Sequence, residues 1–333
     1  MASHSLLDPT PPTPGMGCGR TRAQTRQKNQ DIANEAAFEI NFGKLNVTNI
    51  DARLLLPGED LNDTLIDFFL KMILKVFREE VTKDVPKPRQ VHAFSSLFYT
   101  QLKKDADAGN PFTKLLRWSK DIEILKQDIL VLPICSNKHW YLTLILNPYA
   151  VMDNNEEHHM RRPRMLYLNS LCQGAETDLE NNRPVYENVT MYLQAEARCE
   201  GEREAFTETI QEDVGLVPMQ KNQCDCGVFI LEYVTQILLR PSILRRLGTD
   251  NLSDWFQQSL VTWRRDQLKF ALLYLAKLQE ENKVDNVDDL LEKDEVRARL
   301  KQFFTSKPQT HRRRSVGEEP DIMTVGLAKV PIT

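Results

Sequence analysis

The sequence predicts a protein of the α+β class, since separate parts of one apolar body show helical and strand-like patterns. Residues 59–80 carry apolar side chains at the three- and four-residue spacing of a helix. Three short apolar or alternating segments between residues 128 and 171 are bounded by turn-forming residues, which is typical of neighbouring strands. A second helix, apolar almost all round, begins near Gly227. With 333 residues, 41% of them hydrophobic, the chain can bury a sizeable core.

The two ends differ from this body. Residues 1–40 and 306–333 are rich in proline, glycine and charge, so we expect two disordered tails around one domain at 41–305. Each tail carries a basic cluster, the first from Arg20 to Lys28 and the second from Arg312 to Arg314. Such clusters are compatible with a nuclear address and with an ordinary solvated tail.

Composition excludes several classes of protein. Six cysteines are few for a disulfide framework, and the N-terminus lacks a signal peptide's apolar segment. No apolar run approaches the roughly 20 residues of a membrane span, and a net charge of -4 does not favour nucleic acid as a partner. We therefore expect no association with a membrane and no direct binding of nucleic acid. We expect the protein to be located in the nucleus, the cytoplasm or both.

The first helix places its apolar residues on one side, with Asn62 or Asp63 as the N-cap. This side is predicted to be core and contains Leu65, Ile66, Phe69, Leu70, Ile73 and Phe77.

The predicted strands fall in residues 128–134, 135–147 and 162–171, so that His139 and Asn169 lie at strand ends. The polar insertion between the last two is expected to be a surface loop. Its adjacent His158 and His159 do not indicate a metal site, because neighbouring residues rarely converge on one ion.

The stretch MQKNQCDCGVFILEYV, residues 219–234, places two cysteines at the start of the second helix. Asp225 is a suitable N-cap, which puts Cys226 in the first turn. There the positive end of the helix dipole is expected to lower the pKa of the thiol. Gly227 removes a side chain, which would let a substrate backbone approach the sulfur.

A nucleophilic thiolate needs a proton acceptor and a donor for the negative oxygen of the intermediate. His139 can serve as the base, and Asn169 can orient its ring. The Gln220 side-chain amide and the Cys226 backbone N–H can donate to the oxyanion. On chemistry alone, a Cys/His hydrolase and a buried structural cysteine both remain open.

The segment PMQKNQCDCG resembles the ubiquitin-like-protein-specific cysteine proteases that process and remove SUMO, also called sentrin-specific proteases. Its Pro, Gln, Asn, Asp, Cys and Gly stand where that family places them. HWYLTLI is similar to the family's His-Trp strand, and LYLNSL to the strand that ends in its triad acid. The order His, acid, Cys is also the family's. Over residues 48–282 the chain most resembles the branch that contains sentrin-specific proteases six and seven, which favour SUMO chains.

The resemblance implies a papain-like fold, with the Cys-bearing central helix packed on a small mixed sheet. It implies a nucleophile at Cys226, a general base and acid at His139 and an oxyanion donor at Gln220. Trp140 would form one wall of the tunnel for the Gly-Gly tail of SUMO, and Asp63 would contact the SUMO surface. The structural alternatives are that Trp140 is only core and Asp63 only a helix cap.

Two positions depart from the family pattern. The family's acid is aspartate, whereas this chain has Asn169, which can orient His139 but cannot stabilise imidazolium by charge. We therefore expect reduced activity, and Asn169→Asp to accelerate the reaction. Asp60 replaces an aromatic residue on the other side of the tunnel, which bears on how the modifier's tail is held.

Cys224 has no assigned role. A zinc site would need further ligands at matching spacing, which the sequence lacks, so we expect no metal and no other cofactor. Packing beside the site and a reversible disulfide under oxidation both remain open.

The resulting hypothesis is a monomeric SUMO isopeptidase, whose partners are SUMO and SUMO-conjugated proteins. It would hydrolyse the bond after the terminal Gly-Gly through a thioester. The alternatives are a protease of the same fold acting on NEDD8 or ubiquitin, and a SUMO-binding module inactivated by Asn169.

Overall fold

The protein is described by a computed structural model that covers residues 39–80, 90–148, 163–199 and 210–306. Its centre is a five-stranded mixed sheet in the order β3-β4-β5-β6-β7. The three middle strands are antiparallel to one another, while β3 and β7 each run parallel to their neighbour. The strands are β3 (Val91–Ala93), β4 (Ile129–Ser136), β5 (His139–Leu146), β6 (Arg164–Leu168) and β7 (Gln211–Gly215).

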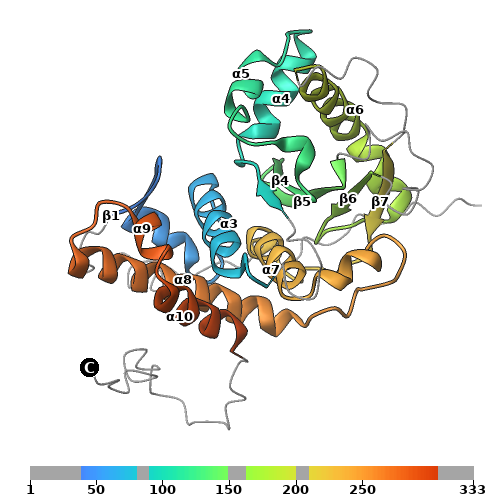
Figure 1. The fold of residues 1–333 in the computed structure, drawn as a ribbon. Coiled ribbons are helices and arrows are strands. Elements are labelled where there is room, and N and C mark those ends of the chain that lie inside the picture. The colour runs from blue at the N-terminus through green and yellow to red at the C-terminus, as the bar shows by residue number, and fades with distance from the viewer. Residues whose placement is uncertain (1–38, 81–89, 149–162, 200–209, 307–333) are drawn as a thin grey trace, which may run out of the picture.

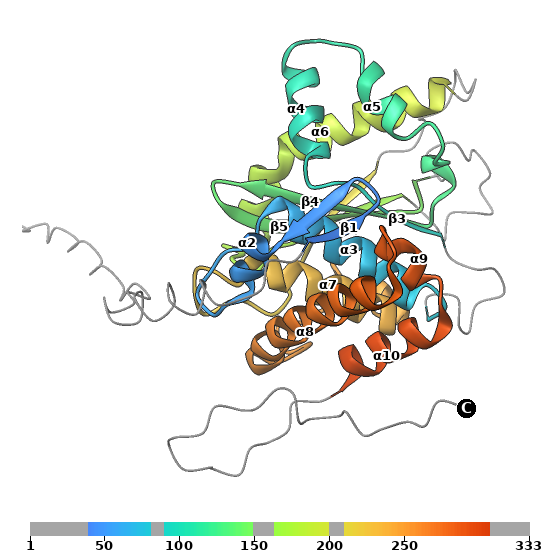
Figure 2. The same cartoon turned by 90° about the vertical axis from the view of Figure 1, so that its left-hand side faces the viewer.

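Helices cover both faces of the sheet, as Figures 1 and 2 show. On one face lie α4 (Phe98–Asp107), α5 (Thr113–Trp118) and α6 (Ala175–Cys199). On the other lie α3 (Asp63–Phe77), α7 (Cys226–Leu239), α8 (Gln258–Asn282), α9 (Val287–Leu291) and α10 (Asp294–Thr305). Short elements complete the described chain: the hairpin β1 (Glu39–Phe42) and β2 (Leu45–Thr48), α2 (Asn49–Ala52), η1 (Arg53–Leu55), η2 (Ile124–Lys126) and η5 (Pro241–Arg245).

The two faces of the sheet belong to two separate hydrophobic clusters. In β4, Ile129 and Val131 pack into the cluster that contains α3 and α7, whereas Leu130 and Leu132 pack into the cluster under α4 and α6. Successive side chains of a strand point to opposite faces, so a strand covered on both sides must be apolar throughout. This requirement explains why residues 129–134 read as one continuous apolar run.

The predicted strands are confirmed, and a tight turn sets the start of β5. Asn137 and Lys138 have φ angles of 52° and 63°, the left-handed conformation that a two-residue type I′ hairpin needs at both positions. The turn pairs Ser136 with His139 and makes His139 the first residue of β5.

The two predicted helices are also present. Asn62, not Asp63, caps α3, since its Oδ1 accepts the N–H of Leu65 at 3.0 Å. Helix α7 is buried over nearly its whole length and packs against both α3 and β5. It therefore fixes Cys226, its first residue, relative to the strand that carries His139.

Some of the predictions fall outside the described residues. The tails at 1–38 and 307–333 lie there, as do His158 and His159 of the predicted loop. Strand β1 starts at Glu39, so residues 39 and 40, which belong to the predicted tail, form part of a strand. Among the helices of the described ranges, none has both the length and the apolar character needed to cross a bilayer.

The pKa of His92, in β3, allows a prediction of how the stability of the protein depends on pH. Burial lowers the pKa of His92 from 6.5 to about 4, so between these pH values only the unfolded chain binds a proton there. The free energy of unfolding should therefore fall by up to about 3 kcal/mol as the pH falls through this range.

His92→Phe keeps an aromatic ring against Phe94, which His92 contacts edge-on at 5.0 Å, and should remove this contribution. Urea unfolding at several pH values tests the expectation. The two proteins should show similar pH dependence above pH 7, and an equal slope below pH 6 would contradict the assignment.

Candidate active site

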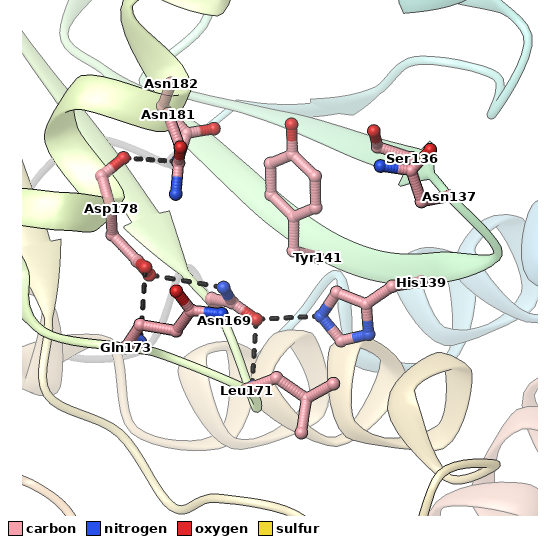
Figure 3. A pocket seen from close by; sticks show the side chains of 10 residues that line it. All are labelled: Ser136, Asn137, His139, Tyr141, Asn169, Leu171, Gln173, Asp178, Asn181 and Asn182. Atoms are coloured by element: carbon pink, nitrogen blue, oxygen red, sulfur yellow. Dashed lines mark hydrogen bonds between the residues drawn. The ribbon is translucent and has the colours of Figure 1, made fainter. Parts of the chain in front are cut away.

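His139 and Asn169 meet at the ends of β5 and β6. The Nε2 atom of His139 lies 2.8 Å from Oδ1 of Asn169, which directly follows β6 (Figure 3). The backbone N–H of Leu171 donates to the same oxygen at 2.9 Å. The predicted pairing of the histidine with this asparagine is therefore present in the structure.

The orientation of the Asn169 amide sets the tautomer of His139. Asn169 Nδ2 lies 3.2 Å from a carboxylate oxygen of Asp178, which can only accept a hydrogen bond when ionised. The amide oxygen must then face His139, so Nε2 carries the hydrogen and Nδ1 keeps its lone pair. Nδ1 makes no hydrogen bond to the described residues, which leaves it available to accept a proton.

Cys226 begins α7 and is 1% exposed. Burial raises the pKa of its thiol, and the carboxylate of Asp60 adds to the rise, whereas backbone hydrogen bonds with Trp140 and Gly227 oppose it. The predicted lowering of this pKa by the helix dipole is therefore wrong, because the loss of water around the sulfur outweighs the helix terminus. A thiolate at this position needs a proton acceptor.

Gln220 is held beside the same strand end. Its Oε1 accepts a hydrogen bond from the Ser170 hydroxyl at 2.7 Å, and its backbone N–H donates to the Ser170 carbonyl at 3.0 Å. Its Nε2 donates to the Asn222 carbonyl at 2.7 Å, which uses one of the two amide hydrogens. Ser170 directly follows Asn169, so the predicted oxyanion donor is hydrogen bonded to the neighbour of the predicted orienting residue.

Asp225 occupies the N-cap position of α7, but its carboxylate makes no capping hydrogen bond. It pairs instead with the guanidinium of Arg265 in α8 at 2.8 Å and accepts from Asn222 Nδ2 at 2.8 Å. The predicted N-cap position is therefore confirmed, but its side chain does not cap the helix, since a buried carboxylate is better satisfied by a buried cation than by one backbone N–H.

Arg265 is itself 3% exposed and joins two loops. One end of its guanidinium donates to three backbone carbonyls between residues 54 and 59, and the other donates to the Cys224 carbonyl and to Asp225. These loops lead directly into Asp60 and into Cys226.

Gly227 has a packing role. A Cβ atom added there would lie 3.0 Å from Cβ of Leu61 and 3.2 Å from Cδ1 of Ile66. The glycine therefore lets α7 approach the start of α3. The space left by its missing side chain faces Leu61 and Ile66, rather than a substrate as predicted.

The predicted substrate-binding residues have different surroundings. Trp140 is 3% exposed, lies in the larger core cluster and donates its Nε1–H to the Leu61 carbonyl at 2.9 Å. Its backbone contacts Cys226, so it is both core and a neighbour of the thiol. Asp60 and Asp63 are exposed, and both carboxylates help to raise the pKa of Cys135, after burial as the main cause. The proposal that Asp63 serves only as a cap is wrong, because Asn62 does so.

An open cavity of about 450 Å³ lies beside the His139–Asn169 pair, on the side of α6 (Figure 3). Most of the residues that line it are polar. The lining consists of Ser136, Asn137, His139, Tyr141, Asn169, Leu171, Gln173, Asp178, Asn181 and Asn182.

Three residues at the site were not predicted from the sequence: Ser170, Asp178 and Arg265. Ser170 was recognisable only as the neighbour of Asn169, while Asp178 and Arg265 lie in charged segments with no local signal. Within the described ranges, no three His, Cys, Asp or Glu side chains gather as a metal site, and no disulfide links the five cysteines present there.

Residues 59–246, more than half of the chain, match the family described as "Ulp1 protease family, C-terminal catalytic domain". The chain belongs to the Ulp1 protease family. The match spans all four residues of the predicted catalytic group.

Curated relatives of this Ulp1-family chain carry related names. A probable ubiquitin-like-specific protease 2A of Arabidopsis thaliana is 26% identical, over 67% of this chain and 30% of its own length. Sentrin-specific protease 7 of Homo sapiens is 26% identical, over 70% of this chain and 27% of its own length. The chain thus spans less than a third of the length of these two relatives.

Solved structures share the fold of this Ulp1-family chain. A crystal structure described as a de-sumoylating protease has a TM-score of 0.54 and 21% identity, covering 80% of this chain and 99% of that one. A structure of the SUMO protease Ulp1 with its catalytic cysteine oxidized to a sulfenic acid has a TM-score of 0.50, covering 78% and 97%. The predicted α+β papain-like type of fold is confirmed.

Because Arg265 is buried and joins two segments, we expect its substitution to cause a large loss of stability. Arg265→Lys keeps the positive charge but cannot supply the fork of donors that holds both loops. We expect the free energy of unfolding to fall by about 3 kcal/mol, because buried carbonyls and the Asp225 carboxylate lose partners.

Urea unfolding measures this change. Arg246→Lys is the matched control, since Arg246 pairs with Asp250 on the surface, and it should cost about 0.5 kcal/mol or less. Equal losses in the two variants would contradict the role assigned to Arg265.

Proposed function

We propose that this Ulp1-family chain is a SUMO-specific cysteine protease, which hydrolyses the peptide or isopeptide bond after the terminal Gly-Gly of SUMO. One observation carries the proposal: the oriented His139–Asn169 pair at the start of β5, the strand whose next residue, Trp140, contacts the buried thiol of Cys226. The names of the relatives and of the similar structures support SUMO as the modifier.

The proposed reaction begins with proton transfer from the Cys226 thiol to Nδ1 of His139. Because burial raises the pKa of this thiol, the thiolate forms only with the imidazolium beside it. The sulfur attacks the carbonyl carbon of the terminal glycine, and the carbonyl oxygen becomes an oxyanion. The Cys226 backbone N–H and the second amide hydrogen of Gln220 donate to that oxyanion.

The imidazolium then gives its proton to the leaving amine, the C–N bond breaks, and a thioester joins the modifier to Cys226. His139 next removes a proton from water, which attacks the thioester and releases the carboxylate and the thiol. Neither step requires a metal ion or an organic cofactor.

The approach to Cys226 favours a slim acyl group. Trp140, which contacts Cys226, is hydrogen bonded to Leu61, and the exposed Asp60 contributes to the electrostatic field at the sulfur. Glycine, which has no side chain, suits a passage of this kind. Asp60 stands where the family has an aromatic residue, so this chain would bound the passage by a carboxylate rather than by a ring.

Two alternatives make different use of the same residues. A protease of this fold could act on NEDD8 or ubiquitin, since Asp60 alters the approach to the sulfur. A SUMO-binding module without activity would result if Asn169 could not support His139 in catalysis. We favour the active enzyme, because Asn169 is hydrogen bonded and fixed in orientation rather than displaced.

Electrophilic probes made from SUMO, NEDD8 and ubiquitin should separate these functions. Each probe carries a reactive group in place of its terminal carboxylate and forms a bond with an active-site thiol. We expect the SUMO probe to label the chain at Cys226, as identified by peptide mass spectrometry. Cys226→Ser should abolish labelling, and Cys224→Ser should leave it within about twofold, because only the thiol at the start of α7 meets the base.

The other outcomes are equally informative. If only the NEDD8 probe or only the ubiquitin probe labelled the chain, the modifier would be that protein and not SUMO. Binding of SUMO without labelling would identify a non-catalytic module and would overturn the proposed reaction.

A further inference from the structure

Asp178 is a buried carboxylate directly behind the Asn169 amide. It lies in the first turn of α6 and is 2% exposed. Oδ2 lies 3.2 Å from Asn169 Nδ2, and Oδ1 accepts the backbone N–H of Gln173 at 3.3 Å. Among the described residues Asp178 forms no ion pair, although an isolated carboxylate is costly to bury.

Among the described residues that line the cavity beside this carboxylate, no other carries a charge that could replace it. Asp178 is the one acidic residue, and His139 the one residue able to become a cation, among those that line the cavity. Tyr141 of β5 lies against His139, and Cys172 lies in the loop before α6. Burial raises the pKa of both groups, and Asp178 adds to both rises, so both are neutral near pH 7.

We infer that Asp178 supplies, through the Asn169 amide, the negative charge that this chain lacks at position 169. Asp178 is thus a positioning residue: it holds Asn169 in the orientation that His139 requires and stabilises the imidazolium from one residue further away. The inference rests on the proposed function to the extent that His139 must become protonated during the reaction.

The hydrogen bonds would allow the two side chains to exchange places. In the native chain, Asn169 Oδ1 accepts from His139 and Leu171, Asn169 Nδ2 donates to Asp178, and Asp178 accepts from Gln173. With Asp at 169 and Asn at 178, the new carboxylate would accept from the first two, and the new amide would donate to it and accept from Gln173. Charge and hydrogen-bond number would be conserved.

The structure also changes what we expect of Asn169→Asp. That substitution alone would place two carboxylates in contact where one amide now donates, and like charges at this distance disfavour each other. The single variant should therefore be slower than the native chain, although the sequence by itself indicated the opposite.

Four proteins test the inference: the native chain, Asn169→Asp, Asp178→Asn and the double variant Asn169→Asp/Asp178→Asn. The measurement is kcat/KM against pH on a substrate with SUMO joined to a fluorescent amine. We expect each single variant to lose about tenfold or more, the cost of roughly one pKa unit of imidazolium stabilisation. In Asp178→Asn the alkaline limb of the profile should also move about one unit to lower pH. The double variant should recover to within about threefold.

Glu176→Gln is the matched control, because it removes one carboxylate from the same turn of α6 at an exposed position. It should keep the native rate and pH profile. The inference is overturned if Asp178→Asn keeps the native profile, if Asn169→Asp is faster than the native chain, or if the double variant is no better than the worse single one. The last result is what a purely structural role for Asp178 would give.

Alkylation of Cys226 by iodoacetamide separates this inference from the proposed function, because it needs no modifier. The rate at pH 7, followed on the peptide that contains Cys226, reports how much thiolate accompanies imidazolium. We expect Asp178→Asn to lower it about tenfold and the double variant to restore it. If this pattern appears while SUMO substrates are not cleaved, the proposed function fails and the role of Asp178 stands. If SUMO is cleaved without this pattern, the role of Asp178 fails instead.

Discussion

The guanidinium of Arg265 is the interaction on which the geometry of the site depends. It reaches from α8 to the loop before α3 and to the loop before α7, and it neutralises the buried Asp225 between them. Asp60 and Leu61 follow the first loop, and Cys226 follows the second. One buried cation therefore holds the segment before Asp60 and Leu61 to the segment before Cys226, far more firmly than a surface ion pair could.

The sheet is the second constraint on the geometry of the site, because the side chains of neighbouring residues in β5 point to opposite faces of the sheet. Trp140 belongs to the cluster with α3 and α7, and it touches Cys226 from that side. His139 stacks on Tyr141, which packs toward α6, and there it meets Asn169. Since both positions are set by one tight turn, a shift of one residue in the β4–β5 register would exchange the two faces and change how His139 lies relative to Cys226.

Burial and charge act against each other at this site. The thiol of Cys226 loses water and faces the field of Asp60, both of which disfavour a thiolate standing alone. In the proposed reaction the thiolate forms as one half of an ion pair, so whatever stabilises the imidazolium of His139 would control the proposed nucleophile as well. This coupling would connect a carboxylate in α6 to a sulfur at the start of α7.

The sequence by itself determined the elements and the principal residues of the site. Strong local patterns identified β4, β5, β6, α3 and α7, and the positions of His139, Asn169 and Cys226 at element ends. Tertiary structure alone decided what surrounds them: Asp225 pairs with a cation 40 positions away rather than capping α7, Gly227 admits Leu61, and Asp178 stands behind Asn169. Periodicity and capping are set by neighbouring residues, whereas burial and the pairing of charges depend on which distant segments the fold brings into contact.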